Sequence, residues 1–151
     1  MSVSFKVEGL EELQSRFKRW PEKFTARLGL VMRASLDVIW EHVPAYPSRP
    51  EKSTYIRQGL LGKSLGTDEQ GNKVGTPDIY QVVNRTGFHE ASFGSKLDYA
   101  PYVIGEREQA WMHKGRWWTI KTVAEKALPK LTRIFNQMAE QMAGWLDGKR
   151  A

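Results

Sequence analysis

The chain has 151 residues, of which 40% are hydrophobic and 26% charged, and a net charge of +6. This composition excludes a wholly disordered chain and allows one packed domain. Cysteine is absent, which excludes disulfides and thiolate metal sites. No apolar run approaches the roughly 18 residues of a membrane-spanning helix, and the first residues lack the apolar centre of a signal peptide. We therefore expect a protein that is made in the cytoplasm and has no membrane partner.

The first third of the chain predicts a strand followed by two helices. Residues 2–7 alternate between apolar and polar side chains, which is the period of a strand with one buried face. Apolar residues recur at spacings of three and four between positions 10 and 20, which predicts a short helix. Pro21 can begin a second helix that ends near His42.

The middle of the chain predicts loops and short strands. Residues 44–54 contain three prolines, which prevent a helix and predict an extended loop. Three glycines in residues 55–66 indicate turns around one short helical turn or strand. Residues 68–78 have the composition of a hairpin-like excursion. Residues 79–84 and 89–94 are strand-like, and we expect them to form a small antiparallel sheet with residues 2–7.

The C-terminal part of the chain predicts one long amphipathic helix. Thr122 and Glu125 have the spacing of a capping box, so we expect the helix to begin there and to run to about Leu146. Pro129 is expected to kink the helix or to divide it in two. The predicted fold class is α+β, with long amphipathic helices packed on a small antiparallel β-sheet in a single domain over residues 1–151.

Residues 98–120 form a run in which aromatic and basic side chains alternate, and we expect it to be a loop. Aromatic residues and arginine concentrate in binding hot spots, so the run predicts an interaction surface. Burial of the rings as core beneath a loop is the alternative, and the sequence leaves open which of the two holds for Trp117 and Trp118. Together with a second stretch near residue 55, the run supplies the interface candidates Tyr99, Tyr102, Arg107, Trp111, His113, Arg116, Trp117, Trp118, Tyr55 and Arg57.

Catalytic and cofactor motifs are not recognisable in the sequence. The three histidines lie far apart and in no known motif. Glu106, Glu108 and His113 match no metal-ligand spacing. Residues 62–64 spell Gly-Lys-Ser, the end of a phosphate-binding loop, but Arg57 stands where that loop needs its first glycine. We therefore expect no enzymatic activity, no metal and no cofactor.

Several short motifs, taken in order, resemble one protein family. They are GLEEL at residues 9–13, a proline-containing loop, YIRQGLLGKS at residues 55–64, YAPYV at residues 99–103 and a C-terminal amphipathic helix. This order is similar to that of the tail-completion proteins of tailed bacteriophages, which include neck, head–tail joining and minor tail proteins. Gln58 departs from the threonine that is usual there. The aromatic-Gly-Thr that usually follows YAPYV is replaced by residues 104–107.

The resemblance implies a structural virion protein at the head–tail junction or the tail end. It implies a homo-oligomeric ring that docks to head-completion or connector proteins and to tail-tube or tail-terminator proteins, with passive contact to passing double-stranded DNA. A protein that binds nucleic acid without sequence preference is the alternative, since a basic-aromatic run can stack on bases and contact phosphates.

Overall fold

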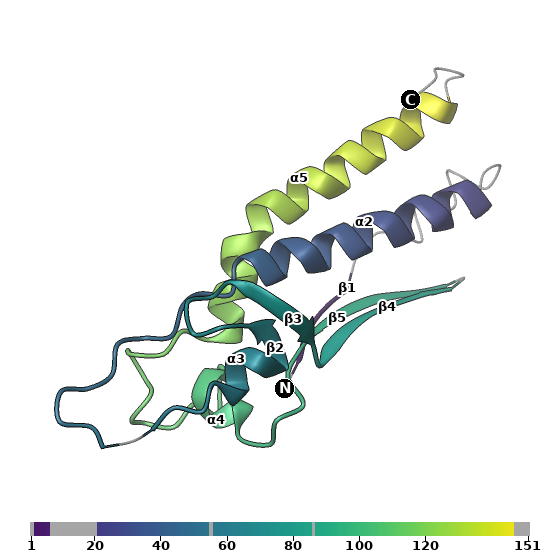
Figure 1. Cartoon of the computed structure of the whole chain (residues 1–151). Helices are drawn as coiled ribbons and strands as arrows, with labels where there is room; N and C mark the ends of the chain where they lie inside the picture. The colour runs from purple at the N-terminus through teal and green to yellow at the C-terminus, as the bar shows by residue number, and fades with distance from the viewer. Residues whose placement is uncertain (1, 7–20, 55, 86, 147–151) are drawn as a thin grey trace.

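The computed structural model describes residues 2–6, 21–54, 56–85 and 87–146. Two layers make up the molecule, a small sheet and two long helices that cover one face of it (Figure 1). The helix predicted over residues 10–20 lies outside the described residues, as does the interface candidate Tyr55.

Three antiparallel strands form the sheet, and this confirms the predicted arrangement. β1 (Ser2–Lys6), β5 (Phe88–Gly94) and β4 (Ile79–Arg85) are paired in the order β1-β5-β4. The register places Phe93 of β5 opposite Val3 on one side and Tyr80 on the other. Side chains in one such row share a face of the sheet, and this row lies on the face that the helices cover, where Phe93 is fully buried.

Helix α2 (Pro21–Glu41) lies against β4, β5 and the second long helix. Its bounds agree with the prediction, because Pro21 is tolerated in the first turn of a helix. Seven side chains of this helix at helical spacing form a buried stripe, namely Phe24, Leu28, Val31, Met32, Ser35, Leu36 and Ile39. The hydroxyl of Ser35 donates to the carbonyl of Val31 at 2.8 Å, which satisfies the one polar side chain in the stripe.

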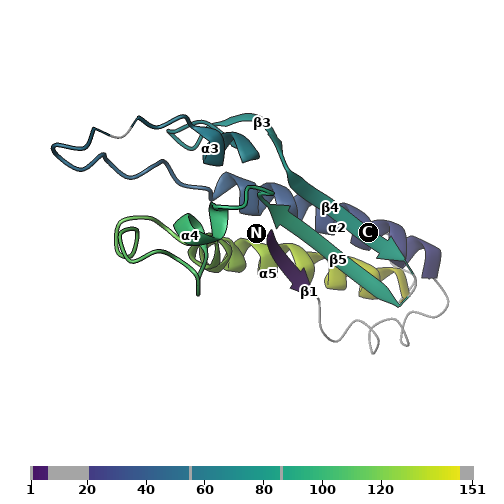
Figure 2. The same ribbon diagram turned by 90° about the horizontal axis from the view of Figure 1, so that it is seen from below.

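Helix α5 (Ile120–Leu146) runs beside α2 on the same face of the sheet (Figure 2). The predicted start at Thr122 is wrong, because Thr119 caps the helix instead. Its hydroxyl oxygen accepts from the backbone N–H of Thr122 at 3.2 Å, which makes Thr122 the third helical residue. The helix continues through Pro129, so the predicted division does not occur, although its first turns are inclined to the rest (Figure 1).

A second, two-stranded sheet forms from the part of the chain between α2 and β4. Helix α3 (Leu60–Ser64) leads directly into β2 (Leu65–Thr67), which pairs antiparallel with β3 (Lys73–Pro77). The buried hydroxyls of Ser64 and Ser95 lie 2.7 Å apart and tie this unit to the end of β5. Of the two alternatives predicted for residues 55–66, a short helical turn or a strand, the structure forms the helical turn α3. The hairpin-like excursion predicted at residues 68–78 contains the turn and the second strand of a hairpin whose first strand, β2, begins at Leu65.

The aromatic-basic run is not a loop throughout. Its first part forms the short helix α4 (Ala100–Ile104), with Pro101 in the first turn. Ala100 and Ile104 are fully buried and fix this helix to the core. The irregular part of the run therefore begins only after α4.

Candidate docking site

Two long loops extend from the same end of the molecule. Residues 43–59 connect α2 to α3, and residues 105–119 connect α4 to α5. Both loops point away from the end where α5 finishes (Figures 1 and 2). They border a cavity of about 630 Å³, which we call the loop pocket. Its lining residues are Tyr46, Arg49, Pro50, Ser53, Arg57, Gln58, Gly59, Leu60, Leu61, Tyr99, Tyr102, Val103, Met112, His113, Arg116 and Trp117.

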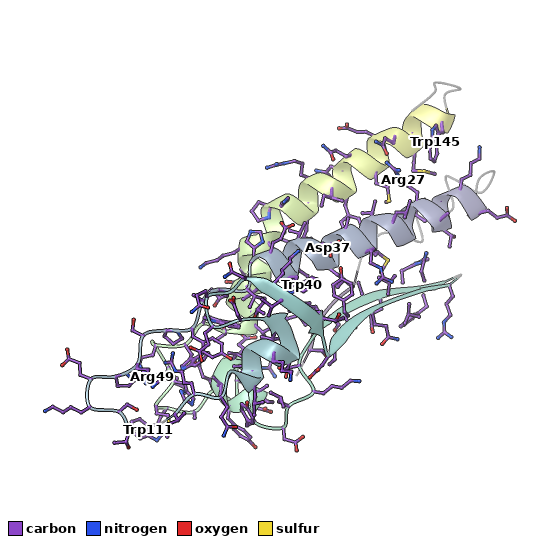
Figure 3. All side chains as sticks on the ribbon, viewed as in Figure 1. Arg27, Asp37, Trp40, Arg49, Trp111 and Trp145 are labelled. Atoms are coloured by element: carbon purple, nitrogen blue, oxygen red, sulfur yellow. The ribbon has the colours of Figure 1, made fainter. Side chains whose placement is uncertain are left out.

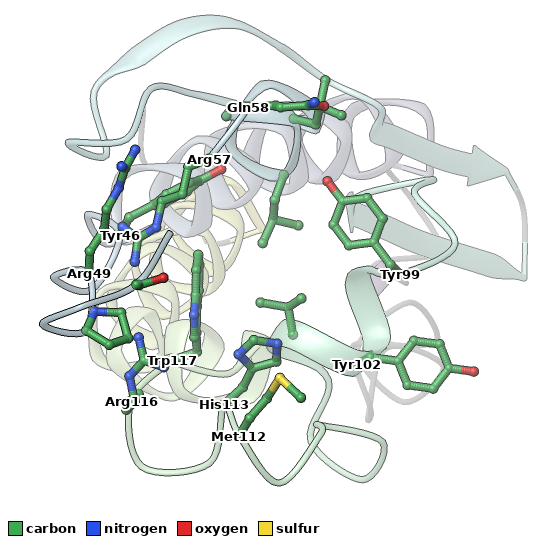
Figure 4. Close-up of a pocket in the computed structure, with 16 residues that line it drawn as sticks. Tyr46, Arg49, Arg57, Gln58, Tyr99, Tyr102, Met112, His113, Arg116 and Trp117 are labelled. Carbon is green, nitrogen blue, oxygen red and sulfur yellow. The ribbon is translucent and has the colours of Figure 1, made fainter. Parts of the chain in front are cut away.

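One side of the loop pocket is basic. Arg49 and Arg57 come from the first loop and Arg116 from the second, and Figure 4 shows them gathered opposite Tyr99 and Tyr102. No Asp or Glu from the described part of the chain lines the pocket. Among the described residues, no ion pair joins any of the three arginines to a carboxylate. Their guanidinium groups therefore have hydrogen-bonding capacity left for a ligand.

Arg57 and two aromatic rings form a contact that joins the walls of the loop pocket. The guanidinium carbon of Arg57 lies 5.7 Å from the ring centroid of Tyr46 and 5.7 Å from that of Trp117. The rings of Tyr46 and Trp117 are themselves 4.9 Å apart. Cation–π attraction and ring contact thus hold the first loop against the second.

Tyr46 anchors the base of the first loop. Its hydroxyl oxygen accepts from the backbone N–H of Gly62 in α3 at 2.5 Å, and its own N–H donates to the carbonyl of Glu69 at 2.7 Å. Burial raises the pKa of the Tyr46 phenol above its usual value, so it is protonated at neutral pH. This residue lies among prolines, and no pattern in the sequence singles it out.

Gln109 closes the second loop upon itself. Its side-chain amide donates to the carbonyls of Val103 at 2.8 Å and Trp117 at 3.2 Å, and only 9% of the residue is exposed. One side chain therefore fixes both ends of the loop. A glutamine in a charged stretch resembles any solvated residue, so the sequence could not have revealed this role.

His113 lies beside Trp117 with their ring centroids 6.2 Å apart. The Nδ1 atom of His113 is buried and has no hydrogen-bond partner among the described residues. Burial lowers the pKa of His113, and the charge of Arg116 lowers it further. The imidazole is therefore neutral at pH 7.

The exposed hydrophobic side chains concentrate around the loop pocket. Of the ten large hydrophobic side chains that are exposed in the described part of the chain, six lie on or beside the two loops, namely Ile56, Leu60, Tyr99, Tyr102, Trp111 and Met112. Trp111 is 81% exposed and Ile56 is 76% exposed. Figure 3 shows Trp111 and Arg49 at the end of the molecule that carries both loops. Contiguous exposed apolar surface marks interaction sites in folded proteins.

The sequence-predicted interface residues separate into two groups. Those that line the loop pocket are Arg57, Tyr99, Tyr102, His113, Arg116 and Trp117. Arg107, Trp111 and Trp118 lie outside the lining. Trp118 is half-buried against the core, and its ring N–H donates to the carbonyl of Ala45 at 3.3 Å. Trp117 is also half-buried against the core, and it lines the pocket as well. It therefore combines the two alternatives predicted for it, a core residue and a residue of an interaction surface.

Sequence reasoning missed several pocket residues on the first loop and on α3, among them Arg49 and Leu60. The proline-rich composition predicted a loop but not the direction in which it runs. Met112 was also missed, although it lies inside the run that the sequence singled out.

The described residues were compared with the requirements of a metal site and of a membrane-spanning helix. No group of three or more His, Asp or Glu side chains there could hold a metal ion. None of the helices in the described ranges is long and apolar enough to cross a bilayer.

Comparison with known proteins finds no family model, no curated protein and no solved structure that matches the chain.

Proposed function

We propose that the chain is a structural assembly protein of a tailed bacteriophage that acts at the head–tail junction or the tail end. In this proposal it forms a homo-oligomeric ring in the virion neck or tail, after synthesis in the host cytoplasm. It docks to neighbouring virion proteins through the end that carries the loop pocket. Double-stranded DNA passes through the ring without specific contacts.

The observation that carries the proposal is the position of the two central motifs of the resemblance. Residues 55–64 and residues 99–103 are far apart in the chain, yet both contribute side chains to the loop pocket. Exposed hydrophobic side chains gather at the same place. Motifs that lie together at an exposed, partly apolar surface suit a docking role, because interfaces bury such surface on assembly.

The test is electron microscopy of a lysate in which this gene alone is silenced. We expect filled heads beside detached tails, or tails of abnormal length. Infectious particles of normal appearance would contradict the proposal.

A surface variant separates docking from folding. Trp111→Ser removes a ring that is 81% exposed, so it leaves the core intact. If Trp111 is a hot spot, the change costs roughly 2 kcal/mol of docking, about thirty-fold in affinity, and complementation of the silenced gene is reduced. Leu128→Ser is the matched control, since Leu128 is 58% exposed, lies within α5 and does not line the loop pocket. Equal complementation by the two variants would place docking elsewhere on the molecule.

A further inference from the structure

We propose that the loop pocket receives an acidic peptide segment that carries an apolar side chain, supplied by a neighbouring protein. The inference deepens the proposed function and rests on it only in that the pocket is a docking site. The volume of about 630 Å³ lies within the range of roughly 300–1,000 Å³ that is typical of ligand pockets. It is large enough for a few side chains of an extended segment.

The basic side of the pocket determines the charge of the segment. Arg49, Arg57 and Arg116 converge from two loops, and no acidic side chain in the lining neutralises them. Glu69 acts electrostatically on Tyr46 but does not line the pocket. A planar guanidinium binds a carboxylate through two parallel N–H···O bonds. Glutamate or aspartate side chains are therefore the groups that fit this side.

The opposite side of the pocket determines the remaining chemistry of the segment. Leu60, Leu61, Val103 and Met112 supply aliphatic surface, and rings come from Tyr99, which precedes α4, and Tyr102, which lies within it. Leu60 and Met112 are exposed, so water covers apolar atoms there until a ligand displaces it. An aromatic or aliphatic side chain next to the acidic residue would contact this side while the carboxylate contacts the arginines.

The distribution of charge favours a peptide over a nucleic acid. A strand of nucleic acid needs a continuous basic path along its phosphates and free ring faces for its bases. Outside the pocket, Lys121 pairs with Glu106 at 2.8 Å and Lys130 pairs with Glu41 at 3.2 Å, which interrupts such a path. Trp117 is already in contact with Tyr46, His113, Trp118 and Arg57.

The experiment is selection of a displayed library of random short peptides on the purified full chain. We expect enrichment of peptides in which Asp or Glu neighbours an aromatic or aliphatic residue. The double variant Arg49→Ser with Arg116→Ser is then expected to weaken binding of the enriched peptides about tenfold or more. The control is the double variant Lys96→Ser with Lys126→Ser. Both lysines are exposed and lie outside the pocket lining, and their replacement removes two positive charges, as the arginine double variant does.

Three results of the peptide experiment would overturn the inference. They are no enrichment, enrichment of peptides without acidic residues, and equal binding by the arginine and lysine double variants. Tighter binding of a single-stranded oligonucleotide than of any selected peptide would also overturn it, in favour of nucleic acid. These outcomes are independent of the microscopy. If no peptide is selected but silencing the gene blocks particle assembly, peptide binding is rejected and the assembly role stands. If a peptide is selected but particles assemble normally, the assembly role is rejected and peptide binding stands.

Discussion

Arg49 and Arg57 lie on the same loop, but of the two only Arg57 contacts aromatic rings of the described residues. Arg57→Ala removes cation–π contacts to both Tyr46 and Trp117, each worth roughly 0.5–1 kcal/mol at a partly exposed site. We expect the free energy of unfolding to fall by about 1 kcal/mol, measured by urea denaturation. Arg49→Ala is the matched control and is expected to change it by less than about 0.5 kcal/mol, because Arg49 is exposed. An equal effect of the two variants would show that these contacts add no stability.

His113 gives stability a dependence on pH near neutrality. Its folded-state pKa is lowered by burial, and by Arg116 to a lesser degree, so the unfolded chain binds more protons as the pH falls below about 6.5. Stability is therefore lost on acidification through that pH. We expect His113→Gln to lose less melting temperature than the native chain between pH 7.5 and pH 5.5.

His89 also has a pKa that burial lowers, so part of the acid sensitivity is expected to persist in the His113→Gln variant. A loss of melting temperature equal to that of the native chain would assign the acid response to other groups.

At the scale of single elements, the start of α5 is set by Thr119. Thr119→Ala removes the hydroxyl that accepts from the N–H of Thr122, and the loss of such a cap costs about 1 kcal/mol, within a range of about 0.5–2 kcal/mol. Thr122→Ala changes a residue inside the first turn and is expected to cost less, because alanine favours helix interiors. Urea denaturation of the two variants distinguishes them. If Thr122→Ala were more destabilising than Thr119→Ala, Thr122 and not Thr119 would be the residue that caps the helix.

The sequence was sufficient to predict the helices and strands whose apolar residues recur with a regular period and pack into the core. The helix predicted to begin at Pro21 contains Phe24 and the strand predicted over residues 89–94 contains Phe93, and both side chains are buried in the core. The start of α5 was missed because Thr119 and Thr122 are both good capping residues, and only the packing of Ile120 against the core selects between them.

The site was harder to predict than the fold. Arg57 and Trp117 were singled out separately, but their contact depends on a path of two irregular loops. That path is fixed by bonds such as those of Gln109 and Tyr46, which leave no periodic pattern in a sequence.

At the scale of the whole molecule, the first loop can be tested as a detachable part. Residues 48–54 are all exposed. Their replacement by a glycine–serine linker of equal length keeps the loop-closure entropy similar and leaves the anchor Tyr46 in place. We expect a melting temperature within a few degrees of the native value, because exposed substitutions change stability by about 0.5 kcal/mol or less. Complementation of particle assembly is expected to be lost, since Arg49, Pro50 and Ser53 leave the pocket.

Two results would contradict this view of the loop. Full complementation by the linker variant would remove the first loop from docking. A much lower melting temperature would make residues 48–54 part of the structural body and not only a carrier of pocket residues.

The separation of the loops from the buried body also has an evolutionary consequence. The core residues of α2, β5 and α5 constrain one another, whereas most of the loop pocket is carried by segments that the sheet and long helices do not need for packing. Mutations in the loop pocket that change which peptide segment it binds therefore cost little stability. A lineage can acquire a new partner while the core of sheet and long helices is inherited unchanged. We expect descendants of this chain to diverge fastest at the very positions that determine what they bind.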